Sequence, residues 1–155
     1  MNTYSDTQII KQLPKNRGAY YHVVIAAEII NQFEQKRKTR FICTLENQLS
    51  FQCGLNHLGD GNFFIILSGQ RLKKIGKILG DTIHFELRED PNPLGVEMPE
   101  VLTVLLQQDE LLQAAFDKLS MGKKRHIIHT IIRIKDIDKQ VDKATEMINL
   151  HFPKP

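Results

Sequence analysis

The stretch "ILGDTIHFELRED", residues 78–90, places a Gly-Asp corner directly before a strand pattern. After the corner, Ile83, Phe85 and Leu87 alternate with polar residues. Successive side chains of a strand point to opposite faces of a sheet, so this alternation is typical of a strand with one buried and one wet face. Gly80 can end a helix without a Cβ penalty. The stretch therefore predicts a helix, a corner and a half-buried strand, in this order.

The residues before this corner carry mainly strand signals. Runs rich in β-branched and aromatic residues recur between turn residues, as in "AYYHVVI" and in the unbroken apolar run "NFFIIL". Such an unbroken run suits a strand that is covered on both sides. A short helix is expected within residues 26–35. We predict strands at residues 7–13, 19–25, 39–45, 49–55 and 62–67, with a hairpin joining the third and the fourth.

The helix before the corner is expected to run from Ser68 to Gly80. The Ser68 hydroxyl is suited to cap the free amides of the first turn. On the helical wheel, Leu72, Ile75 and Leu79 share one face. The opposite face gathers three lysines, Lys73, Lys74 and Lys77.

The stretch "EDPNPLGVEMPE", residues 89–100, marks a domain boundary. Three prolines and a glycine in this short stretch cannot continue a helix or a central strand. Beyond it the apolar residues follow a helical period, which predicts three or four short helices. Ile127, Ile128, Ile131 and Ile134 are expected to form the buried face of one helix, and an apolar stripe on the next helix is formed by Ile137, Val141, Ala144 and Ile148. We predict a β-barrel domain over residues 1–90, an elbow over 91–98 and a helical tail over 99–155.

The composition is that of an ordinary globular chain. Of its 155 residues, 41% are hydrophobic and 25% are charged, which is enough to form a core. No apolar run is long enough to span a membrane, and the first residues lack the order of a signal peptide. We therefore interpret Cys43 and Cys53 as buried thiols in a reducing compartment, although their hairpin strands could bring them together. We expect a cytoplasmic protein without a cofactor. We also expect a monomer, since a chain of this size can bury its own core.

Residues that could carry chemistry are few. His126 and His129 lie on one helical face at a spacing that can chelate a metal. Tetrahedral zinc, however, needs three or four protein ligands, and the sequence offers no second cluster. Neither cysteine lies in an activation motif, and Ser120 reads as a helix N-cap. We therefore predict no catalytic residue and no metal site.

Basic residues recur in groups, although the net charge is only +3. One group is the loop "KRK" with Arg40. We predict that the other two bind an anionic ligand or partner, through Lys73, Lys74, Lys77, Lys123, Lys124 and Arg125. The same side chains could neutralise the phosphates of a nucleic acid, but the strand after the corner carries Glu86 on its wet face and is followed by Glu89 and Asp90. A nucleic-acid-binding or regulatory protein is the alternative, and a small enzyme of unknown reaction is the second alternative.

In the order of its parts, the chain resembles a bacterial two-part family with a small β-barrel domain of unknown function and a YdeI/OmpD-associated helical tail. The matching stretches are "TLENQLSF", "GDGNFF", "LKKIGKILGDTIHFELRED", "PNPLGVEMPEVL" and "FDKLSMGKKRHII". The resemblance implies a barrel distantly similar to the AbrB/MazE-like double-split barrels. It assigns no reaction, and the names of the tail family suggest a role in stress or bacteriocin resistance.

Together these observations predict an α+β protein, with a small double-split-type β-barrel followed by a C-terminal bundle of short helices. The favoured function is that of a non-enzymatic, cytoplasmic bacterial binding module. Its ligand is expected to be an anionic small molecule or a protein partner, bound near the junction of barrel and tail.

Overall fold

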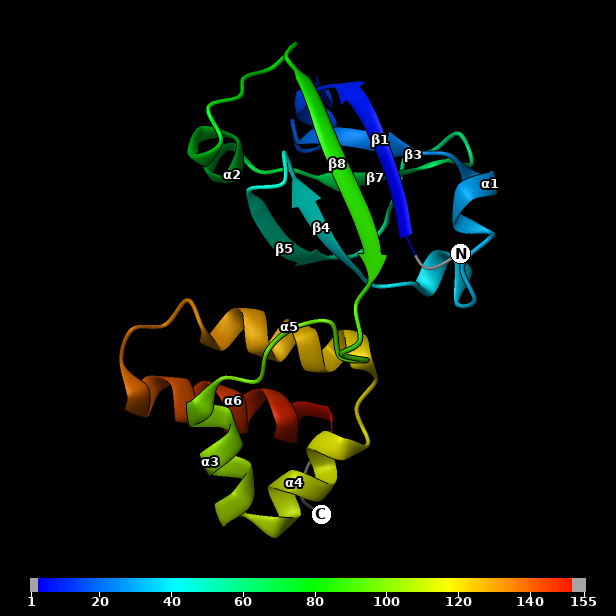
Figure 1. The fold of residues 1–155 in the computed structure, drawn as a ribbon. Helices are drawn as coiled ribbons and strands as arrows, with labels where there is room; N and C mark the ends of the chain where they lie inside the picture. Colours follow the sequence, from blue (N-terminus) through cyan, green and yellow to red (C-terminus); the bar gives the residue numbers. More distant parts are fainter. Residues whose placement is uncertain (1–2, 152–155) are drawn as a thin grey trace. The chain divides into compact units, whose positions relative to one another are not determined.

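The computed structural model describes residues 3–151, and the side chains of residues 3–150. Between Gly95 and Val96 the chain divides into two compact units, here called the β unit and the helical unit. The first unit is built around antiparallel strands, and the second is built from helices (Figure 1). The predicted α+β class is therefore confirmed.

The β unit contains two four-stranded antiparallel sheets. The first has the order β1–β8–β4–β5, with bounds Thr3–Ile9, Thr82–Glu89, Phe41–Leu45 and Leu49–Cys53. The second has the order β2–β3–β7–β6, with bounds Lys11–Gln12, Tyr21–Ile25, Phe63–Ile66 and Asn56–His57. Short helical segments connect some strands, η1 (Lys15–Arg17), α1 (Ala27–Ile30) and η2 (Lys36–Lys38). Within residues 3–151 the strand pairing shows two sheets and no closed barrel, so the double-split barrel stays a prediction.

Two short segments of the chain pass directly from one sheet into the other, without a helix between the strands. Only Ile10 separates β1 from β2, and only Gly54 and Leu55 separate β5 from β6. Ile10 is buried. Its N–H donates to the Asp81 carbonyl at 2.9 Å, and its carbonyl accepts from the Gly80 N–H at 3.1 Å. The Gly-Asp corner therefore holds the point at which the first strand changes sheets.

A side chain continues the pairing across this change of sheet. The Gln8 amide nitrogen donates to the Val24 carbonyl at 2.6 Å, and the Gln8 amide oxygen accepts from the Val24 N–H at 2.9 Å. Val24 lies in β3, beyond the two residues that β2 pairs with. Gln8 is half-buried and also donates to the Asp6 carboxylate at 2.9 Å. The Gln8 side-chain amide thus supplies to Val24 the two hydrogen bonds that the backbone of a neighbouring strand would otherwise make.

Strand β8 lies inside the first sheet, between β1 and β4. Ile83, Phe85 and Leu87 are fully buried, while Thr82 and Arg88 are exposed. The predicted alternation is confirmed. Side chains of the second sheet belong to the same core, among them Val23, Ile25 and Ile65. Since each fully buried aliphatic or aromatic side chain stabilises the fold by about 1.5–3 kcal/mol, this shared core holds the two sheets together.

The helix before the corner is shorter than predicted. Helix α2 spans Gly69–Lys74. It stops where Gly76 adopts a φ of 69°, a left-handed conformation that suits glycine and ends helices. The expected end at Gly80 is therefore wrong. Lys77 and Leu79 follow the helix instead of lying on it.

The helical unit contains α3 (Glu100–Gln108), α4 (Glu110–Asp117), α5 (Met121–Ile131) and α6 (Ile137–His151). The Ser120 hydroxyl accepts from the Lys123 N–H at 3.2 Å, so the predicted cap of α5 is confirmed. Ile137, which begins the predicted apolar stripe of α6, is 65% exposed, whereas Ala144 and Ile148 of the same stripe are buried. The core of the unit is apolar and includes Leu102, Leu106, Leu112, Phe116, Ile127, Ile128, Ile131, Ala144 and Ile148.

The start of the Pro-rich stretch is folded onto the β unit. The Asp90 N–H donates to the Arg40 carbonyl at 2.9 Å. The Asp90 carboxylate accepts from the Gln52 amide and from the Asn92 N–H, both at 2.9 Å. Gly95 has a φ of 76°, and a Cβ at this position would lie 2.5 Å from Arg40 Nε. The Arg40 side chain therefore occupies the space that only a glycine leaves open.

We expect Gln8→Ala to lower the free energy of unfolding by about 1–3 kcal/mol, because it leaves the N–H and the carbonyl of Val24 without their side-chain partner. Chemical denaturation of the whole chain measures this change. Gln12→Ala is the matched control, since Gln12 is an exposed glutamine that makes one hydrogen bond, to the Ala19 carbonyl. Equal losses in the two variants would contradict the bridging role of Gln8.

We expect Gly95→Ala to destabilise the protein more than Gly61→Ala does. Both glycines have positive φ, 76° and 95°, and an alanine in this conformation costs about 1–2 kcal/mol. A Cβ at Gly61 meets nothing within 4 Å, whereas a Cβ at Gly95 meets Arg40. The difference between the two variants in denaturation therefore reports the Arg40 contact, and no difference would refute it.

Candidate functional site

The predicted basic site residues fall into two groups, one in each unit. Lys73 and Lys74 lie on α2 of the β unit, and Lys77 follows this helix. The other three, Lys123, Lys124 and Arg125, lie in the first turns of α5 in the helical unit. Each group is therefore a separate candidate within its own unit.

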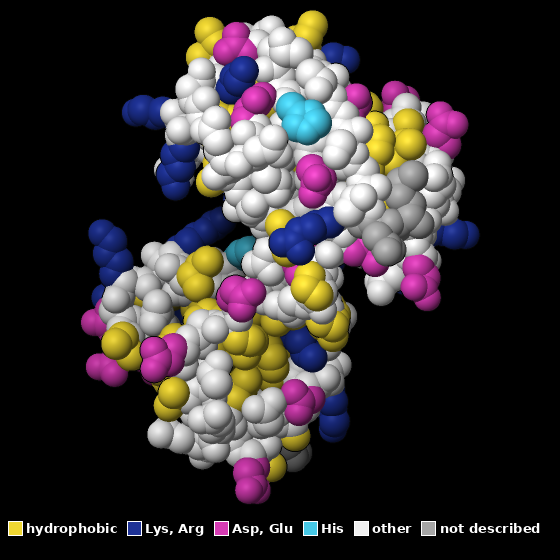
Figure 2. All heavy atoms as spheres, viewed as in Figure 1, with side chains coloured by type: hydrophobic (Ala, Val, Ile, Leu, Met, Phe, Trp, Pro, Cys, Tyr) yellow, Lys and Arg dark blue, Asp and Glu magenta, His cyan; other side chains and the backbone are white. Residues whose placement is uncertain are grey.

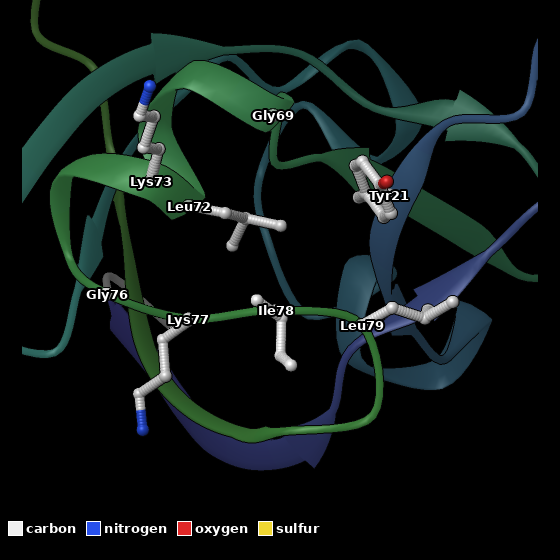
Figure 3. A pocket seen from close by; sticks show the side chains of 8 residues that line it. All are labelled: Tyr21, Gly69, Leu72, Lys73, Gly76, Lys77, Ile78 and Leu79. Carbon is white, nitrogen blue, oxygen red and sulfur yellow. The ribbon is translucent and has the colours of Figure 1, made fainter.

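A pocket of about 390 Å³ lies beside the first group (Figure 3). Lys73 and Lys77 line it, and Lys74 is not among its lining residues. The other lining residues are Tyr21, Gly69, Leu72, Gly76, Ile78 and Leu79. Its size lies within the range of small-molecule sites in proteins, about 300–1,000 Å³.

The early end of α2 produces one wall of this pocket. After Gly76 the chain runs past the helix, and the Lys77 N–H donates to the Leu72 carbonyl at 3.0 Å. The Ile78 N–H donates to the Asp81 carboxylate at 2.9 Å, and the Asp81 N–H donates to the Ile78 carbonyl at 3.0 Å. These hydrogen bonds of the chain itself fix residues 77–79, which form one wall of the pocket.

The pocket is apolar inside and basic at its border. Leu72 is buried and projects from α2 towards the segment that carries Ile78 (Figure 3). Ile78 is 71% exposed and Leu79 is 48% exposed, which is unusual for two adjacent large apolar side chains. The ammonium groups of Lys73 and Lys77 point to opposite sides, away from the apolar centre (Figure 3). The arrangement suits a ligand with an apolar body and an anionic group.

Two further interactions hold the basic residues around α2. Lys77 Nζ lies 3.7 Å from Glu46 Oε1, in a partly exposed ion pair. Arg71 lies over the Phe51 ring, with 3.9 Å between its guanidinium carbon and the ring centroid. Arg71 therefore packs against β5, while Lys73 is on the border of the pocket.

Ser68 fixes the start of α2 next to the pocket. Its hydroxyl accepts from the Arg71 N–H at 3.2 Å, so the predicted cap is confirmed. Its φ is 59°, a conformation that costs a residue other than glycine about 1–3 kcal/mol. The sequence pattern indicates the cap but not this strained backbone, because the strain is imposed by how β7 meets the helix.

The basic group on α5 has partners within its own unit. Lys124 Nζ lies 5.4 Å from the centroid of the Phe116 ring. The Lys123 N–H is bonded to the Ser120 cap. His126 and His129 are on the same helix. Among the side chains that the structure describes, no group of three or more His, Cys, Asp and Glu residues could hold a metal ion.

The two cysteines are free thiols. Cys43 pairs with Phe51, and Cys53 pairs with Phe41, so the cysteines are diagonal neighbours on β4 and β5. Diagonal neighbours are about 7–8 Å apart, too far for a disulfide. Burial raises the pKa of the Cys43 thiol, and burial raises the pKa of Cys53 to about 12. Both thiols are therefore protonated and poor nucleophiles at neutral pH.

At pH 8 we expect both cysteines to react with Ellman's reagent far more slowly in the folded protein than in urea. The variants Cys43→Ala and Cys53→Ala assign the signal to one thiol each. Rapid reaction of either thiol in the folded protein would contradict the burial.

The raised thiol pKa values also predict the pH dependence of stability. In the unfolded chain a thiol loses its proton near pH 8.5, whereas folded Cys53 keeps it until about pH 12. The unfolded state therefore binds fewer protons in this interval, and the free energy of unfolding falls as the pH rises. Thermal melts between pH 8 and pH 11 measure the fall, which should be smaller in Cys53→Ala.

Each of the two units matches a known family model. A family model described as "Domain of unknown function (DUF1905)" matches residues 6–87, and a model described as "Bacteriocin-protection, YdeI or OmpD-Associated" matches residues 95–150. The first match spans more than half of the 155 residues. The chain therefore belongs to the DUF1905 family, with a YdeI/OmpD-associated tail, and the predicted two-part resemblance is confirmed.

Searches of curated proteins and of solved structures found no match to the chain. Within residues 3–151, none of the helices has the length and hydropathy needed to cross a membrane.

Proposed function

We propose that this protein is a binding module whose β unit takes an amphipathic anionic small molecule in the pocket between α2 and residues 76–79. The observation that carries the proposal is the exposure of Ile78 and Leu79 on a hydrogen-bonded segment bordered by Lys73 and Lys77. When a ligand covers exposed apolar side chains that are held in place, the removal of their surface from water stabilises the complex.

The apolar lining supplies most of the affinity in this proposal. Covering apolar surface contributes about 25 cal/mol per Å². An ion pair between exposed groups contributes only about 0–1 kcal/mol. Lys73 is therefore expected to select the sign of the ligand charge, and the aliphatic lining to retain the ligand. Lys77 already has Glu46 as a partner, so Lys73 is the stronger candidate to meet an anion.

The nucleic-acid alternative uses the same lysines and explains less of the pocket. Phosphate contacts would engage Lys74 as well as Lys73 and would leave Ile78 exposed to water. Such binding would fall steeply with salt, whereas binding in an apolar pocket would not. A mobility shift of duplex DNA at two salt concentrations separates the two functions.

Three further statements belong to the same proposal. The module acts in the cytoplasm, as a monomer, without catalysing a reaction. It has a role in stress or bacteriocin resistance, and the name of the family matched at residues 95–150 supports the second of these roles. The site predicted near the junction of barrel and tail stays a prediction.

We also propose that the two sheets form a double-split-type barrel. The support is the pair of segments that pass between the sheets, β1 to β2 and β5 to β6. If β1 and β2 are treated as one continuous strand, and β5 and β6 as another, the two sheets join into a closed ring. Its strand order is β1/β2, β8, β4, β5/β6, β7, β3, and β3 pairs with β1/β2 again.

The binding test uses 1-anilinonaphthalene-8-sulfonate, a fluorescent amphipathic anion, with dodecanoate and dodecyltrimethylammonium as competitors. We expect the dye to bind and dodecanoate to displace it at lower concentration than the cation does. Ile78→Ser and Lys73→Glu should each weaken dye binding by about three- to tenfold, because each removes one half of the amphipathic match.

Lys74→Glu is the matched control for Lys73→Glu. It makes the same charge change on the same helix, next to a residue that lines the pocket, and should leave binding nearly unchanged. Equal effects of the two lysine variants would show a general electrostatic attraction and contradict the pocket. Equal displacement by the two competitors would contradict the choice of an anion.

A further inference from the structure

A second apolar hollow lies in the helical unit. It has a volume of about 640 Å³ and is lined by residues of α3 and of the first turns of α6. Figure 2 shows apolar side chains gathered on the visible face of this unit, with acidic and basic side chains at the border of the area. We call this hollow the α3–α6 groove, and its lining residues are Glu100, Val101, Val104, Leu105, Gln108, Ile137, Gln140 and Val141.

The groove is built from two helical stripes. On α3, Val101, Val104, Leu105 and Gln108 recur at the spacing of one helical face, and on α6 Ile137, Gln140 and Val141 do the same. Residues three and four apart on a helix lie above one another. The groove therefore presents two rows of apolar side chains, a surface that can receive the apolar stripe of another helix.

Hydrogen bonds hold both walls in place. The Gln140 side-chain amide donates to the carbonyls of Ile131 and Ile134, at 3.1 and 2.7 Å, and so ties α6 to the end of α5. At the start of α3, the Thr103 hydroxyl and the Leu102 N–H both bond to the Pro99 carbonyl. A preformed groove loses little conformational entropy when it is filled.

Two apolar side chains of the groove are exposed, and the other three are half-buried. Ile137 is 65% exposed and Val104 is 42% exposed, although the helical periodicity places Ile137 in the stripe that continues to Ala144 and Ile148. Those two residues are buried. One apolar face of α6 thus extends from the buried core of the unit, at Ala144 and Ile148, to the groove, at Ile137.

The charge around α3 indicates what can cover it. From residue 97 to residue 110 the chain carries four acidic residues, Glu97, Glu100, Asp109 and Glu110, and no basic one. Glu100 is the single charged residue that lines the groove. On the α6 side the charges alternate in sign, with Asp138 and Asp142 next to Lys139 and Lys143. A complementary partner therefore carries its positive charge on the side that faces α3.

We propose that the α3–α6 groove binds an amphipathic, basic helix of a partner protein. The apolar stripe of that helix lies against Val104, Leu105 and Ile137, and its Lys or Arg residues face Glu100 and the acidic ends of α3. This surface lies in the helical unit and is independent of the small-molecule pocket of the β unit.

The test uses the full chain and a fluorescein-labelled peptide of leucine and lysine, about 18 residues long and patterned as an amphipathic helix. Two comparison peptides keep its length. One replaces lysine with glutamate, and the other scrambles the order so that no apolar stripe forms. Fluorescence anisotropy is expected to show saturable binding of the basic amphipathic peptide and at least tenfold weaker binding of both comparison peptides.

Variants of the protein locate the binding site. Val104→Glu and Ile137→Glu change exposed side chains of the groove, so the fold is expected to survive, and each should weaken binding about tenfold or more. Glu100→Lys should weaken binding about threefold or more and reduce its salt dependence. Leu111→Glu is the matched control, since Leu111 is 77% exposed in the same unit and does not line the groove.

The proposal is overturned if no saturable binding is observed, if Leu111→Glu weakens binding as much as Val104→Glu does, or if the acidic peptide binds as well as the basic one. It is also overturned if light scattering shows a dimer that Val104→Glu dissociates, because the groove would then be covered by a second copy of the chain.

Discussion

The corner at Gly80 and Asp81 connects three parts of the β unit, namely the distant residue Ile10, the segment before the corner and strand β8 after it. The Gly80 N–H and the Asp81 carbonyl both bond to the backbone of Ile10, where the first strand changes sheets. The Asp81 carboxylate bonds to the Ile78 N–H and holds one wall of the pocket. Strand β8, which carries the centre of the core, begins at the next residue, Thr82. The change of sheet, the core strand and the pocket wall therefore share one set of hydrogen bonds.

The pocket depends on this corner because the helix ends early. If α2 continued to Gly80, as helical periodicity suggests, Leu79 would lie on the buried face with Leu72. Instead, Gly76 ends the helix, and the chain reaches the corner as an irregular segment. That segment needs partners for its backbone, and the Leu72 carbonyl and the Asp81 carboxylate supply them. The result is a fixed surface that keeps Ile78 in contact with solvent.

Local patterns in the sequence predict much of this fold. The alternation of Ile83, Phe85 and Leu87 predicts a strand with one buried face, and the caps by Ser68 and Ser120 follow from residue chemistry alone. The pairing of β1 with β8 could not be predicted, since it joins residues about eighty positions apart and no local pattern encodes it. The hydrogen bonds from the Gln8 side chain to Val24 could not be predicted either, because no sequence pattern marks a glutamine that pairs with a distant backbone. Lys73 and Lys77 were predicted as site residues from charge, but their apolar neighbours in the pocket were not.

Two apolar positions show the physical limit of the periodicity argument. Leu79 shares an apolar face with Leu72 on the helical wheel and is 48% exposed, and Ile137 begins the apolar stripe of α6 and is 65% exposed. Periodicity shows that a face is apolar, but it does not show what covers that face. When the chain itself covers only part of a stripe, the remainder is available to a ligand or a partner. The two residues lie in the two hollows for which we propose ligands, the pocket beside α2 and the α3–α6 groove. In this protein the apolar positions that the chain leaves uncovered are therefore the positions at which we propose binding.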